Sequence, residues 1–288
     1  MRRVQRAAFE VGAAISGGVA HPFQRWNEQR IYPKERYVES ERKYGYLAKL
    51  FTVFGMHVHI GAGSADEAVR LCAPLFVALS SNSPCWQGEV SGFCSSRSNL
   101  VGAFPMSGIQ PHELRSWQDF RAYFDRLAGF GIVNSIKDFY WDVRPKPEYG
   151  TIELRVLDTP LKPVYAAALA CYARELCLEF AAQPGQWPSN GSRELYAWSR
   201  FNAARDGVEG SWIDPETGVP VPIAQVIRAD LARLARRSVD PGFGEACTVI
   251  EALIQDGGQA GWLRSHLASG GGMNDLARVA SELFDSDS

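Results

Sequence analysis

Two short segments in which apolar and polar residues alternate constrain the fold of this chain most. They cover residues 139–144 and 151–158, and a turn rich in Pro and Gly at residues 145–150 joins them. Successive side chains of a β-strand point to opposite faces, so each segment has one apolar and one polar face. A short turn of this composition favours an antiparallel hairpin. The sequence therefore predicts a sheet with one apolar face and one charged face.

The charged face of this hairpin carries two carboxylates and two guanidinium groups. Glu153 and Arg155 share the polar side of one strand, about 6–7 Å apart, and Asp142 and Arg144 lie on the polar side of the other. Carboxylates so placed repel each other unless a cation lies between them, and Mg²⁺ prefers such oxygen ligands. Arginines at fixed positions suit forked recognition of phosphate or carboxylate. This set predicts a phosphoryl-transfer surface, and structural salt bridges on a solvated face explain the spacing equally well.

A third segment, residues 56–61, alternates strictly, with His57 and His59 on the face opposite Met56, Val58 and Ile60. Single histidines usually reflect packing or hydrogen bonding. Two histidines at positions i and i+2 of one strand also suit a metal or ligand site. From the residues alone both interpretations stay open.

Bulk properties exclude several classes of protein. The chain has 288 residues, 46% of them hydrophobic, and a formal net charge of −2, so it is globular and has no basic run for non-specific nucleic-acid binding. No apolar stretch approaches the roughly 20 residues of a membrane helix. The six cysteines form no C-x-x-C pair and no zinc-type spacing, which is typical of reduced cysteines in a cytoplasmic protein.

Helical patterns surround these strands. We expect helices over residues 4–15, 116–129 and 165–180, a helix that continues into a strand over residues 39–54, and a polar loop over residues 80–99. A capping-box sequence at residues 64–67 predicts a further helix start. Hairpin strands mixed with helices favour an α+β fold. We expect a single domain over residues 1–288, with a sheet-bearing part (1–183) and a mostly helical part (184–288).

Several motifs together resemble the glutamate–cysteine ligase type 2 family, also called the carboxylate–amine ligases. The resemblance runs in order along nearly the whole chain, and the motif around Glu153 is its most specific part. The matching segments are residues 18–23, 55–61, 78–84, 95–99, 141–145, 150–160, 200–201 and 203–207.

The resemblance implies a glutamine-synthetase-like fold, in which an antiparallel sheet has helices packed on one face and binds ATP and Mg²⁺ on the other. It implies transfer of a phosphoryl group from ATP to a carboxylate, usually that of glutamate, followed by attack of an amine such as that of cysteine. By similarity, Glu153 and His57 would bind the metal and Arg155 would stabilise the transferring phosphoryl group. The other candidates for binding substrate or nucleotide are His59, Arg97, Asp142, Arg144 and Arg205.

Two departures from the family pattern matter. The family opens with a strand that bears closely spaced glutamates of the metal site, and nothing before Val4 supplies them. We therefore expect this chain to lack the N-terminal segment, to bind Mg-ATP weakly, and to leave a sheet edge that favours self-association into a homo-oligomer. Asp206 also stands where the family pattern predicts an aromatic residue, which weakens the case for Arg205.

Two other functions compete with the ligase. A metal-dependent hydrolase could use a His-x-His pair on a strand, but such enzymes need further histidines at later strand ends. A non-catalytic remnant that retains the fold without a complete metal site is the stronger alternative. The identity of the carboxylate and of the amine is not determined by these motifs.

Overall fold

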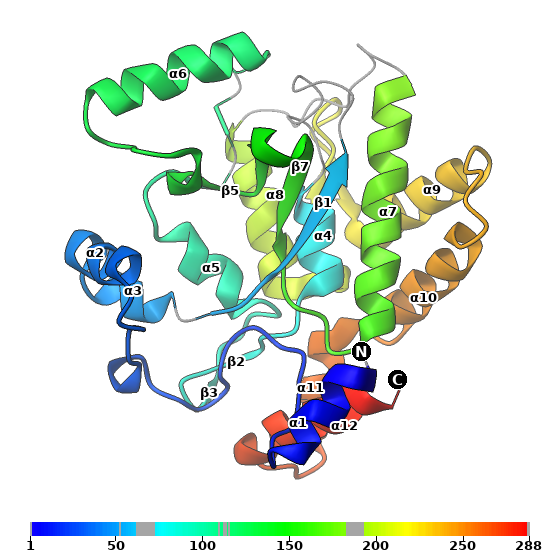
Figure 1. The fold of residues 1–288 in the computed structure, drawn as a ribbon. Helices are drawn as coiled ribbons and strands as arrows, with labels where there is room; N and C mark the ends of the chain where they lie inside the picture. Colours follow the sequence, from blue (N-terminus) through cyan, green and yellow to red (C-terminus); the bar gives the residue numbers. More distant parts are fainter. Residues whose placement is uncertain are drawn as a thin grey trace.

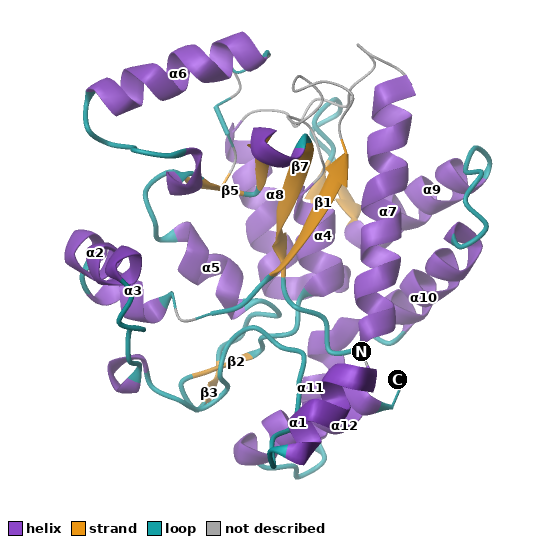
Figure 2. Ribbon diagram, in the orientation of Figure 1, coloured by secondary structure: helices purple, strands orange, loops and turns teal. Residues whose placement is uncertain are grey.

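The computed structural model describes residues 2–51, 53–61, 73–108, 110–111, 114, 116–182 and 193–286. A small central sheet is surrounded by helices, and the described part of residues 184–288 is mostly helical (Figures 1 and 2). The helix expected to start at residues 64–67, and the boundary at residue 183 between the two expected parts, lie outside the described residues.

The α-helices are distributed along the whole described length of the chain. They are α1 (Arg2–Glu10), α2 (Glu35–Tyr44), α3 (Tyr46–Leu50), α4 (Ala73–Ser80), α5 (Ser96–Gly102), α6 (Trp117–Gly129), α7 (Pro163–Ala182), α8 (Arg193–Asp206), α9 (Ile223–Ala235), α10 (Phe243–Gln255), α11 (Gly258–Ala268) and α12 (Leu276–Asp285).

The strands are short and form one three-stranded sheet and three two-stranded pairs among the described residues. They are β1 (Met56–Gly61), β2 (Cys85–Trp86), β3 (Glu89–Val90), β4 (Ser107–Gly108), β5 (Tyr140–Trp141), β6 (Val143–Lys146), β7 (Thr151–Leu157), β8 (Ser211–Ile213) and β9 (Pro220–Pro222). The main sheet has the order β1-β7-β6 and is antiparallel throughout.

The main sheet buries its apolar face against helices. Ile60 of β1, Val143 of β6 and Leu154 of β7 belong to one large core cluster together with residues of α4, α7, α8, α9 and α10. All eight residues of α4 are buried, as expected for a helix that crosses the core. Figure 1 shows α4 and α8 behind the sheet and α7 beside β1. The expected apolar side of the sheet is confirmed.

The predicted hairpin forms, but its first strand is divided. Tyr140 and Trp141 pair in parallel with β4, whereas residues from Val143 onward pair with β7. Asp142 lies between the two pairings, where its N–H donates to the carbonyl of Gly108 and its carbonyl accepts from Arg155. The expectation of one continuous strand over residues 139–144 is therefore wrong, because Asp142 is the point where the chain changes partner strand.

The helix expected over residues 116–129 is confirmed as α6. Ser116 accepts from the N–H of Asp119 and begins α6, as expected. The single helix expected within residues 39–54 is instead two helices, α2 and α3, separated by Gly45. Gly45 has a φ of 59°, which is incompatible with a right-handed helix. The expected polar loop over residues 80–99 contains β2, β3 and the first turn of α5.

The two ends of the described chain lie next to each other, with α1 beside α12 (Figure 1). The side chain of Gln5 donates to Asp285 at 2.7 Å. α1 is shorter than expected and ends at Glu10.

Two further features of the described residues are the character of the helices and the state of the cysteines. None of the helices in the described part of the chain has the length and apolar character to cross a membrane. The five cysteines that the structure describes, Cys85, Cys94, Cys171, Cys177 and Cys247, are all free thiols.

Candidate functional site

The charged face of the sheet is centred on Glu153, in the middle strand. The backbone register places His59 of β1 on one side of Glu153 and Arg144 of β6 on the other. Neighbouring strands lie about 4.8 Å apart, so side chains in one row can touch directly. The row His59–Glu153–Arg144 therefore results from the register of the two strand pairs.

Arg144 holds the inner oxygen of Glu153. Its Nε and Nη2 lie 2.9 and 2.7 Å from Oε2 of Glu153, and its Nη1 donates to the carbonyls of Phe139 and Lys137. The side chains of Arg144 and Glu153 are only 6% and 4% exposed. This forked ion pair is buried and fixes the carboxylate in one orientation.

The outer oxygen of Glu153 faces a more open rim. Nη1 of Arg155 lies 2.9 Å from Oε1, Nδ1 of His57 lies 3.0 Å from it, and Nε2 of His59 lies 3.6 Å from it. The two histidine side chains are about one-third exposed and that of Arg155 is 16% exposed. Glu153 and Arg155 share one face, as the alternation predicts, and His57 lies on that face with them.

A β-bulge lies at the end of this face. Met56 pairs with Leu157 and Val58 with Leu154, so two residues of β7, Arg155 and Val156, lie opposite His57 alone. Such an extra residue bends a strand and changes the direction of its side chains.

The pKa shifts follow from this geometry. Burial raises the pKa of Glu153, but its bond to His57 and the charges of Arg155 and Arg144 outweigh this effect and hold the pKa far below its usual range. Burial lowers the pKa of His57, and Arg155 and Arg97 lower it further against the opposing effect of Glu153. Glu153 is thus a carboxylate, and His57 is a neutral imidazole at neutral pH.

Asp142 points away from this row, toward α8. Its Oδ2 accepts from Tyr196 at 2.7 Å and from Nε of Arg200 at 2.9 Å, and it is only 3% exposed. The expected grouping of Asp142 with the charges around Glu153 is therefore wrong, since the break between β5 and β6 turns this side chain to a different partner.

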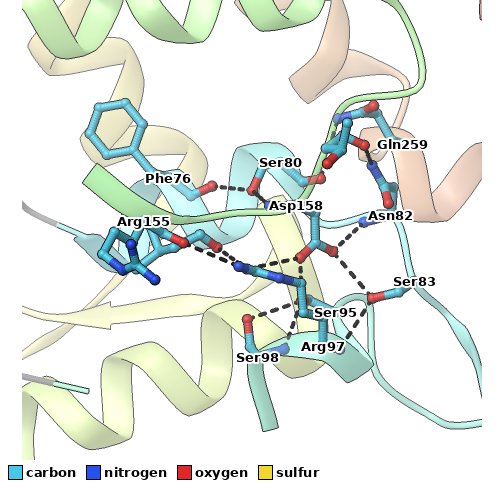
Figure 3. Close-up of polar contacts among 12 residues, drawn as sticks. Phe76, Ser80, Asn82, Ser83, Ser95, Arg97, Ser98, Arg155, Asp158 and Gln259 are labelled. Carbon is cyan, nitrogen blue, oxygen red and sulfur yellow. Dashed lines mark hydrogen bonds and ion pairs between the residues drawn. The ribbon is translucent and has the colours of Figure 1, made fainter. Parts of the chain in front are cut away.

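Arg97 lies behind the bulge, at the start of α5. Its Nη1 and Nη2 donate to the carbonyls of Val156 and Arg155 at 3.1 and 3.2 Å, and Nη1 lies 3.8 Å from Oδ1 of Asp158 (Figure 3). Its side chain is only 8% exposed, and these contacts of its guanidinium are with other groups of the protein.

The structure does not bring Arg205 into this group. Its guanidinium forms a forked ion pair with the neighbouring Asp206 and lies over the ring of Phe201. Nearly half of its side chain is exposed.

The described residues fit an anion better than a bare metal ion. Four arginines lie in or next to the site: Arg144 and Arg155 contact Glu153, whereas Arg97 and Arg200 pair with Asp158 and Asp142 outside this row. The two arginines on Glu153 exceed its single negative charge by one when all three groups are ionised. No group of three His, Cys, Asp or Glu side chains in the described ranges could hold a metal ion. Both oxygens of Glu153 already accept from arginines. These residues do not form a Mg²⁺ site by themselves, and they do suit phosphate or carboxylate.

Comparison with known proteins identifies the family. A model of glutamate–cysteine ligase family 2 matches residues 1–278. The chain belongs to this family.

Relatives in several bacteria support the assignment. A protein of Janthinobacterium sp. (strain Marseille) is 43% identical over 96% of this chain and 77% of its own length. A protein of Methylibium petroleiphilum is 43% identical over 93% of this chain and 74% of its own length. A protein of Verminephrobacter eiseniae is 42% identical over 97% and 76%. Each is named "Putative glutamate--cysteine ligase 2". Family and names together support a glutamate–cysteine ligase-like function.

Sequence reasoning missed three members of the charged cluster: Tyr196, Arg200 and Asp158. Arg200 and Asp158 fall within motifs that carry the family resemblance, which was a usable signal. Tyr196 is four residues before Arg200, so the two share one face of α8, but nothing local predicts that Asp142 is their partner.

Proposed function

We propose that this family member is an ATP-dependent ligase that joins the side-chain carboxylate of glutamate to the amine of cysteine. The observation that supports this proposal most directly is the arrangement around Glu153. Its carboxylate is held in one orientation, and the partly exposed side chains of Arg155 and His57 lie at its outer oxygen. The arginines on Glu153 leave an excess of positive charge there. Such a surface suits the anions of this reaction, a nucleotide triphosphate and a carboxylate.

In the proposed reaction, a carboxylate oxygen of glutamate attacks the terminal phosphorus of ATP, and the bond to the ADP oxygen breaks. The amine nitrogen then attacks the carbonyl carbon of the acyl phosphate, inorganic phosphate leaves, and the nitrogen loses a proton. Arg155 would stabilise charge on the transferring phosphoryl group, since its side chain is the most exposed of the four arginines. Arg144 is more deeply buried and would hold Glu153 in place.

The prediction that Glu153 and His57 bind Mg²⁺ is changed in this proposal, because both oxygens of Glu153 already accept from arginines. We expect Mg²⁺ to arrive with the nucleotide, where it would supply positive charge against the phosphates. The glutamine-synthetase-like fold, a cytoplasmic location and self-association also remain predictions. The free thiols of the described cysteines are compatible with the cytoplasm.

An isotope experiment tests the acyl phosphate. Glutamate labelled with ¹⁸O in its side-chain carboxylate, with ATP, Mg²⁺ and cysteine, should give one labelled oxygen in the inorganic phosphate released per dipeptide formed. Dipeptide formation with unlabelled phosphate would contradict the phosphoryl-transfer route. Failure to form any dipeptide would contradict the ligase proposal and leave the non-catalytic alternative.

The role of Arg155 is tested by Arg155→Ala. Because its positive charge is placed beside the reacting phosphate, we expect turnover to fall by at least about a hundredfold. Arg228→Ala is the matched control, since Arg228 forms an exposed ion pair with Glu251 on α10. Equal turnover of Arg155→Ala and wild type, with normal folding, would remove Arg155 from the mechanism.

A further inference from the structure

A buried polar network lies directly behind the β7 bulge and is centred on Asp158. This carboxylate is 1% exposed and accepts from three groups: the N–H of Asn82 at 3.1 Å, Oγ of Ser83 at 3.2 Å and Oγ of Ser95 at 3.0 Å. Its own N–H donates to Oγ of Ser80 at 3.0 Å. Figure 3 shows how these contacts converge on Asp158 from different segments of the chain.

Arg97 connects this network to the candidate site. One edge of its guanidinium faces Asp158, and its two Nη atoms donate to the carbonyls of Arg155 and Val156. These are the two bulge residues that lie opposite His57. Arg97 therefore binds the backbone at the point where β7 departs from regular pairing.

The other side of this guanidinium lies against Gly55, at the entry to β1. A Cβ atom on Gly55 would overlap Nη2 of Arg97, so any larger residue there would force the guanidinium to shift. Arg97 thus lies beside the residue that precedes β1, two residues before His57, and donates to the carbonyl of Arg155 in β7.

We propose that Asp158 and Arg97 are positioning residues, which together hold the β7 bulge so that Arg155 points at Glu153 and the bound substrate. Asp158 orients Arg97, and Arg97 fixes the two bulge carbonyls. The catalytic consequence rests on the proposed function, whereas the structural statement does not.

The first test is structural and needs no activity. With ¹⁵N-labelled arginine, the Nε–Hε NMR signal of Arg155, identified from its absence in Arg155→Lys, should shift in Asp158→Asn, while that of Arg228 stays in place. Asp230→Asn is the matched control, because Asp230 likewise accepts from a hydroxyl group, that of Tyr172, but lies on α9 outside the site. An unchanged Arg155 signal in Asp158→Asn would overturn the proposal.

The second test is a double-mutant cycle. Asp158→Asn should lower kcat by about tenfold to a hundredfold in the wild-type background, because small displacements of a catalytic group have large effects on rate. In the Arg155→Ala background the same change should have little effect, since the group that it positions is gone. A purely structural role predicts the same fold-change in both backgrounds, and that result would overturn the proposal.

Arg97→Lys repeats both tests if Asp158→Asn does not fold. Lysine keeps the positive charge beside Asp158 but lacks the planar fork that reaches both carbonyls. A shifted Arg155 signal with a non-additive cycle supports the proposal, and an unshifted signal or an additive cycle contradicts it. An inactive wild type would refute the proposed function alone, because the NMR test would still decide the position of Arg155.

Discussion

At the scale of single residues, the site depends on how buried charges are paired. Glu153 and Arg144 are almost fully buried, and a charge in such a place is tolerated only with a partner and further hydrogen bonds. Arg144 has both, from Glu153 and from two backbone carbonyls. Removal of one partner leaves the other charge unpaired in the interior.

Glu153→Gln should therefore lower the free energy of unfolding by about 3 kcal/mol at pH 7. The pKa of Glu153 is lowered in the folded protein from its ordinary value of 4.5, so its stabilisation is complete above that value and is lost as the pH falls below it. We expect the difference in the free energy of unfolding between wild type and variant to be smaller by about 1.4 kcal/mol at pH 3.5, one unit below 4.5.

Urea unfolding at both pH values measures this difference. Glu251→Gln is the control, because Glu251 pairs with Arg228 at the surface and should contribute less than about 1 kcal/mol. If the difference in the free energy of unfolding between wild type and Glu153→Gln grew as the pH fell, the ionised carboxylate would be destabilising in the folded state.

At the scale of elements, the start of α5 joins helix capping to the site. Ser95 accepts from the N–H of Ser98, and its hydroxyl also donates to Asp158. The cap therefore satisfies the helix end and the buried carboxylate at once. Ser116 caps α6 in the same way, since its hydroxyl accepts from the N–H of Asp119.

This pair of caps allows a matched comparison. Ser116→Ala should cost about 1 kcal/mol of stability and leave ligase activity unchanged. Ser95→Ala should cost about 2–4 kcal/mol, because Asp158 also loses a buried donor, and it should lower activity. Thermal unfolding and dipeptide formation measure the two effects. Equal losses from both variants would separate Ser95 from the Asp158 network.

At the scale of the whole molecule, one core supports the sheet and the helices that follow it. The main core cluster includes residues from β1, β6 and β7 and from helices as late in the chain as α10. Ligand binding at the charged face should thus stabilise the whole cooperative unit.

Mg-ATP at ten times its Kd should add about 1.4 kcal/mol and raise Tm by about 2 °C or more. Mg²⁺ alone should produce no comparable shift, since the described residues form no metal cluster. Scanning calorimetry with Mg²⁺, with ATP plus EDTA and with Mg-ATP distinguishes these cases. An equal shift from Mg²⁺ alone would reveal a metal site that exists without the nucleotide.

The sequence by itself determined which side chains share a face of the sheet. Glu153 was placed with Arg155, and His57 with His59, because strand alternation is a local property with a period of two residues. The helix over residues 116–129 was predicted for the same reason, since helical periodicity is also a local pattern. Family motifs then indicated the chemistry, which spacing alone left open.

Only the tertiary structure decided which partners these residues have. Asp142 turns to Tyr196 and Arg200, more than fifty residues away in the chain, and Arg97 reaches the β7 bulge from a helix that begins some sixty residues earlier. Such contacts depend on how α5 and α8 pack against the sheet. No local pattern encodes that packing, because burial of the whole core sets it and not the propensity of any one segment.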